Sequence, residues 1–183
     1  TLSRSDTDSV LGANRCADTL LMAAPVSSSS TNDITINRAW QNGSKNASLN
    51  SPVNPQPGYG TTITNGNTAG AVANGFDLGN TASPSIYYMS PGPSPTWVAP
   101  SSTYVPITSH EGYMLFVRGH RGVTISNQFA TPDSTTLEPK GRLNIGDVTK
   151  SIVAGVQVIG NPYASAISFN NVTYNGINPG TID

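Results

Sequence analysis

The sequence has little charge, one cysteine and no long apolar run. Only 10% of its 183 residues are charged and the net charge is −1, so it lacks the basic stripe that nucleic-acid binding requires. No run of 18 apolar residues is present, which predicts no membrane insertion. Cys16 has no second cysteine to pair with inside the chain and is best explained as a small buried hydrophobe.

The sequence also lacks the common catalytic and cofactor motifs. It has no Gly-x-Ser-x-Gly motif, no phosphate-binding loop and no dinucleotide fingerprint. His110 and His120 are its only histidines, Glu111 and Glu138 its only glutamates, and most aspartates lie in predicted turns. We therefore predict no enzyme, no catalytic residue and no cofactor. A hydrolase is the least favoured functional class.

Two oxygen-rich turns are the only, weak, candidates for a calcium site. Asp6 and Asp8 lie in the motif DTD, and Asp77 lies in NGFDLGN. Neither loop holds the three or more acids of a tight calcium site, and turns require Asn, Asp and Gly in any case. The simpler interpretation is that these are turn residues and that no metal binds.

Turn formers and short β-prone runs dominate the sequence. Ser, Thr and Asn make up roughly a third of it, with 18 Gly and 14 Pro. Val, Ile, Thr, Tyr and Trp recur in short runs between these turn residues, which is typical of an all-β protein. The predicted strands are Thr19–Ala23, Gly60–Thr64, Pro84–Ser90, a short one at Trp97, Tyr113–Val117, Val123–Ser126, Thr135–Pro139, Gly141–Gly146, Lys150–Gly160 and Asn171–Gly176.

These strands predict one all-β module over residues 1–183, a β-sandwich with a jelly-roll arrangement as a variant. Residues 1–18 form an irregular lead-in, and the loops are long and rich in Pro, Gly and Asn. The start at Thr1 suggests a piece excised or processed from a longer protein. At most one short helix is expected: Asn32 or Asp33 caps it, Ile36 and Trp40 share a face, and Gly43 ends it.

Two runs are predicted to supply the core. In Tyr113–Val117 both faces are apolar, which indicates a central strand covered on both sides. In Ser151–Ile159 the alternation places Ile152, Ala154, Val156 and Val158 on one side. We predict that Tyr113, Leu115 and Val117, together with Val156 and Val158, are nearly fully buried.

The cluster after the first of these runs, RGHRG, is interpreted as structural. Gly119 makes the turn, and Arg118 and Arg121 flank it. The planar guanidinium carries five N–H donors, which suit loop carbonyls or an aspartate from a neighbouring strand. No catalytic site is predicted at this cluster.

A second structural motif, GNPY, is predicted to turn a corner between strands. Gly160 permits the backbone turn, the Asn161 side chain bonds to nearby backbone, Pro162 fixes the bend, and the Tyr163 hydroxyl is anchored.

Aromatic side chains support the main alternative function, a carbohydrate-binding module. Trp97, Tyr88 and Tyr104 are candidate glycan contacts, since exposed rings on a sheet can stack on sugars. A core of this size also needs aromatics. Burial is favoured for Trp40 and for one of Tyr87 and Tyr88.

Motifs along the chain resemble those of a known family. The second half contains GYMLFVRGHRG, TTLEPKGRLNIGDVT and VIGNPYASAISF, and the first half contains LLMAAPVSSS, INRAWQNG, GYGTTITNG and PSIYYM. In this order, from about Leu20 to Asn175, they resemble a module near the C-terminus of very large secreted Bacteroidota surface proteins that carry a type IX secretion sorting domain. The chain departs from the family at His120, where an acid is usual, and at Cys16–Asp18, where the family has an Arg and a Trp.

The resemblance implies an extracellular structural or adhesion module at the cell surface, within long adhesin-like or filament-like chains. Its implied partners are neighbouring modules of the same chain or like copies, with surface glycans as a further candidate. Bacteroidota also attach O-glycans at short motifs of Asp, then Ser or Thr, then an aliphatic residue or Thr. DSV at Asp8, DTL at Asp18 and DST at Asp133 fit, and Ser9 and Ser134 are the candidate acceptors because DSV and DST lie in predicted loops.

Overall fold

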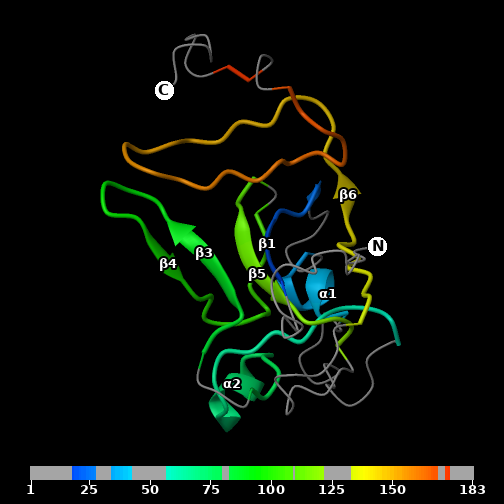
Figure 1. Ribbon diagram of the computed structural model, residues 1–183. Helices are drawn as coiled ribbons and strands as arrows, with labels where there is room; N and C mark the ends of the chain where they lie inside the picture. The colour runs from blue at the N-terminus through cyan, green and yellow to red at the C-terminus, as the bar shows by residue number, and fades with distance from the viewer. Residues whose placement is uncertain are drawn as a thin grey trace, which may run out of the picture.

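A computed structural model describes residues 18–27, 34–42, 57–79, 83–108, 110–121, 133–168 and 172–173. Within these residues the fold is all-β, with two short helices (Figure 1). Its main feature is a four-stranded antiparallel sheet in the order β1-β5-β3-β4. These strands are β1 (Asp18–Met22), β5 (Tyr113–Val117), β3 (Ile86–Ser90) and β4 (Thr96–Val98). A smaller sheet pairs β2 (Val26–Ser27) with β6 (Arg142–Leu143).

One face of the four-stranded sheet is buried. Leu115 of β5 and Ile86 of β3 lie opposite each other and are fully buried, and Tyr113 is 4% exposed. Helix α1 (Ile36–Trp40) packs on this face, where the rings of Trp40 and Tyr113 meet edge to face at 5.2 Å. The core therefore lies between the sheet, α1 and long irregular segments (Figure 1).

The predicted all-β class is confirmed, whereas a sandwich is not. In the described residues, α1 and irregular chain lie against the buried face of the four-stranded sheet, where a sandwich would place a broad second sheet. A second helix, α2 (Ala69–Ala73), corrects the prediction of at most one. It begins at Thr68, whose side-chain oxygen accepts a hydrogen bond from the Ala71 amide, which is an N-cap contact.

Helix α1 forms where the sequence predicts it, but its cap differs. The N-cap is Thr35, whose side-chain oxygen accepts from the Arg38 amide, and not Asn32 or Asp33. The turn that follows the helix uses Asn42, whose φ of 53° lies in the left-handed region that Asn tolerates. Neither helix in the described part of the chain is long and apolar enough to span a membrane.

Several predicted strands do not form. Gly60–Thr64 and Thr135–Pro139 make only isolated bridges, such as Thr64 with Asp77 and Thr136 with Tyr59. Lys150–Gly160 also forms no strand and bridges only at Val156 and Ile159. Val123–Ser126 and most of Asn171–Gly176 lie outside the described residues.

Residues 144–168, which we call the C-terminal segment, form a long open loop across the upper end of the sheet (Figure 1). The predicted burial of Val156 is wrong, because this side chain is 58% exposed, and Val158 is only half-buried. The large apolar side chains exposed in this segment are Ile145, Ile152, Val153, Val156, Ile159 and Ile167.

The face of the four-stranded sheet that points away from α1 is largely apolar too. We call its side chains the outer face: Thr19, Leu21, Tyr87, Met89, Trp97, Met114 and Phe116. Met114 pairs with Leu21 on one side and with Tyr87 on the other, and Met89 pairs with Trp97. Leu21 is 69%, Trp97 39% and Phe116 36% exposed. Strand β5 is therefore central, as predicted, but it is covered on one face only, and on that face Val117 is half-buried, where near-complete burial was predicted.

Candidate functional site

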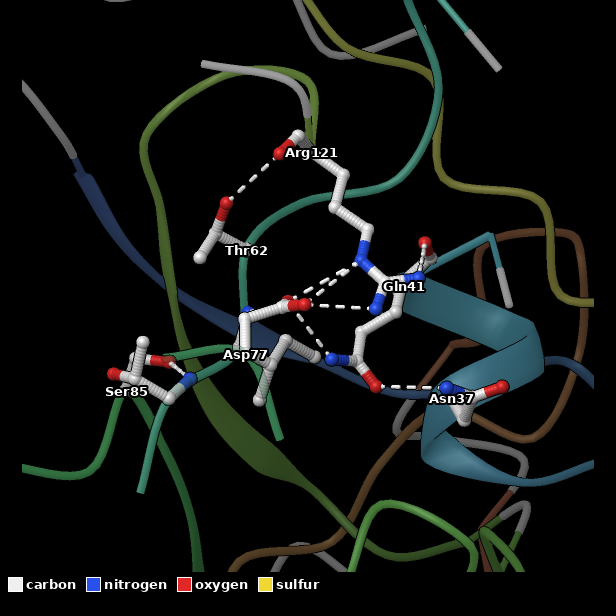
Figure 2. Close-up of polar contacts among 8 residues, drawn as sticks. Asn37, Gln41, Thr62, Asp77, Ser85 and Arg121 are labelled. Carbon is white, nitrogen blue, oxygen red and sulfur yellow. Dashed lines mark hydrogen bonds and ion pairs between the residues drawn. The ribbon is translucent and has the colours of Figure 1, made fainter. Parts of the chain in front are cut away.

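The loop after β5 carries a buried arginine, Arg121. Its Nη2 donates to Oδ1 of Asp77 at 2.7 Å, and its Nε donates to the same oxygen at 3.1 Å. Its Nη1 donates to the backbone carbonyl of Gln41 at 3.1 Å. The Arg121 and Asp77 side chains are only 2% and 7% exposed. Figure 2 shows the guanidinium between its two partners, so this is a buried ion pair with further hydrogen bonds.

Two amide side chains extend the ion pair towards α1. Oδ2 of Asp77 accepts from Nε2 of Gln41 at 2.9 Å and from the backbone amide of Ile63 at 3.0 Å. Oε1 of Gln41 in turn accepts from Nδ2 of Asn37 at 3.0 Å. We call Asn37, Gln41, Asp77 and Arg121 the clasp (Figure 2).

The clasp joins four segments that are far apart in the sequence. Its residues come from α1 and the residue after it, from the stretch that follows α2, and from the loop after β5. The backbone of Arg121 adds two contacts to a fourth segment: its amide donates to the Tyr59 carbonyl, and its carbonyl accepts from the Thr62 hydroxyl. Because the ions are desolvated, loss of either partner would leave an uncompensated buried charge.

Asp77 is not a turn residue, and its position does not suit calcium. It makes a parallel bridge with Thr64, and its two carboxylate oxygens already accept from Arg121, Gln41 and Ile63. A calcium ion needs carboxylate oxygens free to coordinate it, whereas here a guanidinium already neutralises the charge. Asp6 and Asp8 lie outside the described residues. No cluster of three or more potential metal ligands occurs within the described ranges.

The turn around Gly119 lies against Asp133, a residue of another segment. Gly119 has a φ of 124°, and a Cβ there would lie 2.8 Å from the backbone nitrogen and oxygen of Asp133. His120 Nε2 lies 3.3 Å from Oδ2 of the same aspartate, at a partly exposed position. Arg118 lies over the Phe116 ring at 5.7 Å. Arg118 and Arg121 thus point to different surroundings, one at the outer face and one in the interior.

The GNPY motif makes the side-chain contacts that the sequence predicts for Asn161 and Tyr163. Oδ1 of Asn161 accepts from the Tyr163 amide at 3.0 Å, and its Nδ2 donates to the Ser165 carbonyl at 2.7 Å. The Tyr163 hydroxyl donates to the Gly146 carbonyl at 2.6 Å. Pro162 is buried, and its carbonyl accepts from Nδ2 of Asn144. The motif therefore ties two parts of the C-terminal segment together. Since residues 144–168 contain no strand, the predicted corner between two strands is wrong.

Gly160 does not make the predicted turn; it allows two chain segments to lie close together. Its φ lies outside the left-handed region, but a Cβ there would lie 2.4 Å from the Ala23 side chain and 2.7 Å from the Glu111 carbonyl oxygen. Its amide donates to the His110 carbonyl at 3.0 Å. The missing side chain lets the C-terminal segment lie directly against the end of the sheet.

Three further ionisable residues lie near β5: Tyr113, Glu111 and His110. The Tyr113 hydroxyl donates to Oε2 of Glu111 at 3.3 Å. Burial, and after it the negative charge of Glu111, raises the pKa of Tyr113 far above its ordinary value. Burial and the nearby Lys150 lower the pKa of His110, against the opposing effect of Glu111. Tyr113 thus stays a neutral donor, and His110 favours its neutral form.

The candidate glycan contacts do not share one surface. Trp97 lies on the outer face, whereas Tyr88 points to the opposite side and packs against the core, 6.5 Å from the Tyr113 ring. Tyr104 lies in the loop after β4, close to Gly75. The ring that shares the outer face with Trp97 on the neighbouring strand is Tyr87. The alternation in β3 identifies it, because Ile86 is buried and every second residue follows it inward.

Two parts of the clasp, Asn37 and Gln41, were missed by sequence reasoning. Gln41 contacts Asp77 from 36 residues away and Arg121 contacts it from 44, so no local spacing indicates the network. Of the candidate O-glycan acceptors, Ser134 is exposed and Ser9 lies outside the described residues.

Comparison of the chain with protein-family models, with curated proteins and with solved structures finds no match.

Proposed function

We propose that this chain is a non-enzymatic, extracellular structural and adhesion module of a large bacterial surface protein. The observation that supports this most directly is the use of its ionisable side chains. Asp77 and Arg121 pair with each other in the interior, and His120 lies beside Asp133 at a loop contact. These groups hold segments together, while large apolar side chains lie on the surface.

The resemblance of the sequence motifs supports the setting of this proposal. Modules with the GYMLFVRG and GNPY motifs belong to secreted Bacteroidota surface proteins, so export by the type IX route and a cell-surface location follow by analogy. The partners proposed on this basis are neighbouring modules of the same long chain or like copies of it. The apolar outer face and the exposed apolar residues of the C-terminal segment offer surfaces for such contacts.

The test is made on the producing cells. An antibody against the module should label intact cells, and brief protease treatment of those cells should remove the label. Deletion of the module from the parent gene should reduce adhesion or surface assembly. Restriction of the protein to the cell interior would contradict the proposal. So would hydrolysis of a peptide or glycan by the purified chain that Asp133→Asn abolishes without unfolding it.

A second candidate is carbohydrate binding, which the exposed ring of Trp97 favours. Its ring is 39% exposed, and Tyr87 lies on the same side of the neighbouring strand. A glycan array probed with the wild-type chain and with Trp97→Ala tests this directly. Binding that disappears in the variant supports the second candidate, and absence of any bound glycan rules against it.

A further inference from the structure

The outer face has the chemistry of a covered surface. A sheet with one solvated face normally carries polar side chains on it. Here five of the seven outer-face residues are Leu, Met, Phe or Trp, and the other two are Tyr87 and Thr19, which lies across from Phe116 at the edge strand β1. Leu21 is nevertheless 69% exposed and Phe116 36%. An apolar surface continuous over neighbouring strands marks a site of contact with another molecule.

Charge favours a copy of the same face as that molecule. None of the seven outer-face side chains carries a formal charge, and the whole chain has a net charge of only −1. Arg118, over the ring of Phe116, lies at the margin of the face. Apart from Arg118 at the margin, two outer faces can therefore approach without opposing like charges, and near-zero net charge removes the long-range repulsion that keeps most proteins apart.

Polarity disfavours a sugar as the main occupant. A carbohydrate site combines a stacking ring with polar groups that bind the sugar hydroxyls. The neighbours of Trp97 on the outer face are Met89, directly across, and Tyr87, diagonally across. Only the Tyr87 hydroxyl could bind a sugar hydroxyl there, so most hydroxyls of a stacked sugar would lose water without a replacement partner.

The size of the face sets the strength of such a contact. Four strands about 4.8 Å apart, with about 3.3 Å per residue over five residues, give a footprint of roughly 300 Å². A stable complex buries about 800 Å² on each partner. The outer face alone is smaller than this, so free copies should associate weakly, with Kd in the range of about 10 µM to 1 mM. Crowding on a surface would raise their effective concentration.

We propose that the outer face packs against the outer face of a second copy of this chain, as an isologous two-layer contact. Each copy would supply the second sheet that covers the other, at the spacing of about 10 Å that packed sheets adopt. The contact rests on the proposed structural role of the module and names a like copy as its partner. Leu21, Met114 and Phe116 contribute apolar contacts, and Trp97 reports on them because its ring becomes covered.

Sedimentation equilibrium from about 1 µM to 1 mM tests this contact. The chain carries Cys16→Ser so that no disulfide links two copies. We expect a monomer–dimer equilibrium, with a blue shift of Trp97 fluorescence as concentration rises, while Trp40, fully buried, stays constant. Leu21→Glu should weaken the dimer at least about tenfold. Ile145→Glu is the matched control: Ile145 is 82% exposed but lies in the C-terminal segment, so the variant should not change the equilibrium.

Three results would overturn the contact. They are a monomer over the whole range, equal weakening by Ile145→Glu and Leu21→Glu, and a shift of Trp97 fluorescence by a soluble oligosaccharide while the chain stays monomeric. Circular dichroism shows whether Leu21→Glu is folded, and Phe116→Glu provides a second variant if it is not. A monomeric chain found on the cell surface would overturn this contact alone, whereas a dimer confined to the cell interior would overturn the proposed function.

Discussion

The strand Tyr113–Val117 and the run Ser151–Ile159 both consist largely of apolar, strand-forming residues. The first lies between β1 and β3, and its Leu115 is fully buried. The second crosses the end of the sheet, bridges only at Val156 and Ile159, and leaves Val156 58% exposed. The comparison shows that a run of apolar, strand-forming residues is able to pair as a strand. Burial of its side chains, however, requires neighbouring strands on both sides.

A second contrast lies between the clasp and the outer face. The clasp places charged and amide groups in the interior and gives each side chain at least one partner within the chain, although Oδ1 of Asn37 accepts no hydrogen bond. The outer face places apolar side chains on the surface, with no covering layer in the described residues. The interior is therefore fixed by the chain itself, while the surface is available to a partner.

The largest expected effect comes from breaking the clasp. Arg121→Met should lower the free energy of unfolding by about 3–5 kcal/mol, because Asp77 would remain buried without its counter-charge. Urea denaturation of the variant against wild type measures this. Arg142→Met is the matched control at an exposed position, and should stay within about 0.5 kcal/mol of wild type. If both variants lose equally little, the clasp does not stabilise the interior.

Alanine substitutions compare the contributions of the two apolar runs to stability. Leu115→Ala should lower the free energy of unfolding by about 2–5 kcal/mol, since it removes a fully buried side chain. Val156→Ala should change it by about 0.5 kcal/mol or less, because the side chain is largely exposed. Denaturation curves of the two variants, recorded under one set of conditions, give both numbers. A loss above 2 kcal/mol in Val156→Ala would show that the C-terminal segment is packed after all.

A smaller effect is expected at the start of α1, the helix that covers the buried face of the sheet. Thr35→Ala removes the side-chain oxygen that accepts from the Arg38 amide, and should lower the free energy of unfolding by about 0.5–2 kcal/mol. Thr96→Ala, at an exposed position of β4, serves as the control. Thr35→Ser should restore most of the loss, because serine keeps the hydroxyl. Failure of this rescue would assign the effect to the lost methyl group.

The smallest effect concerns His110, at the contact between the sheet and the C-terminal segment. Burial, with Lys150 as a second cause, lowers the pKa of His110 below its ordinary value of about 6.5. The unfolded chain therefore binds the proton more readily, so this contribution is present above about pH 6.5 and is lost as the pH falls through the folded pKa. His110→Gln should lose stability less steeply than wild type between about pH 7.5 and 5.5. An identical slope in both proteins would contradict this.

The elements that the sequence predicts are those fixed by local pattern. Trp40 and Ile36 lie four residues apart on a buried helix face, and Tyr113–Val117 is apolar enough to be central in any sheet. Helix α2 was missed because Ala-Gly-Ala-Val-Ala contains a helix-weakening glycine and shows no amphipathic period. Asp77 was assigned to a turn because Gly and Asn residues lie close to it in the sequence, while its side-chain partners, Gln41 and Arg121, lie more than 30 residues away.

The central contrast, a sheet fixed within the chain and a C-terminal segment that stays open, is tested most directly by hydrogen exchange of backbone amides at low protein concentration. The amides that pair β5 with its neighbours should exchange only through global unfolding, at least about 1,000-fold more slowly than free peptide. The amides of Ser151–Gly155 should exchange within about tenfold of the free-peptide rate. Equal protection of Ser151–Gly155 and of Tyr113–Val117 would contradict the account, since both runs would then be paired strands.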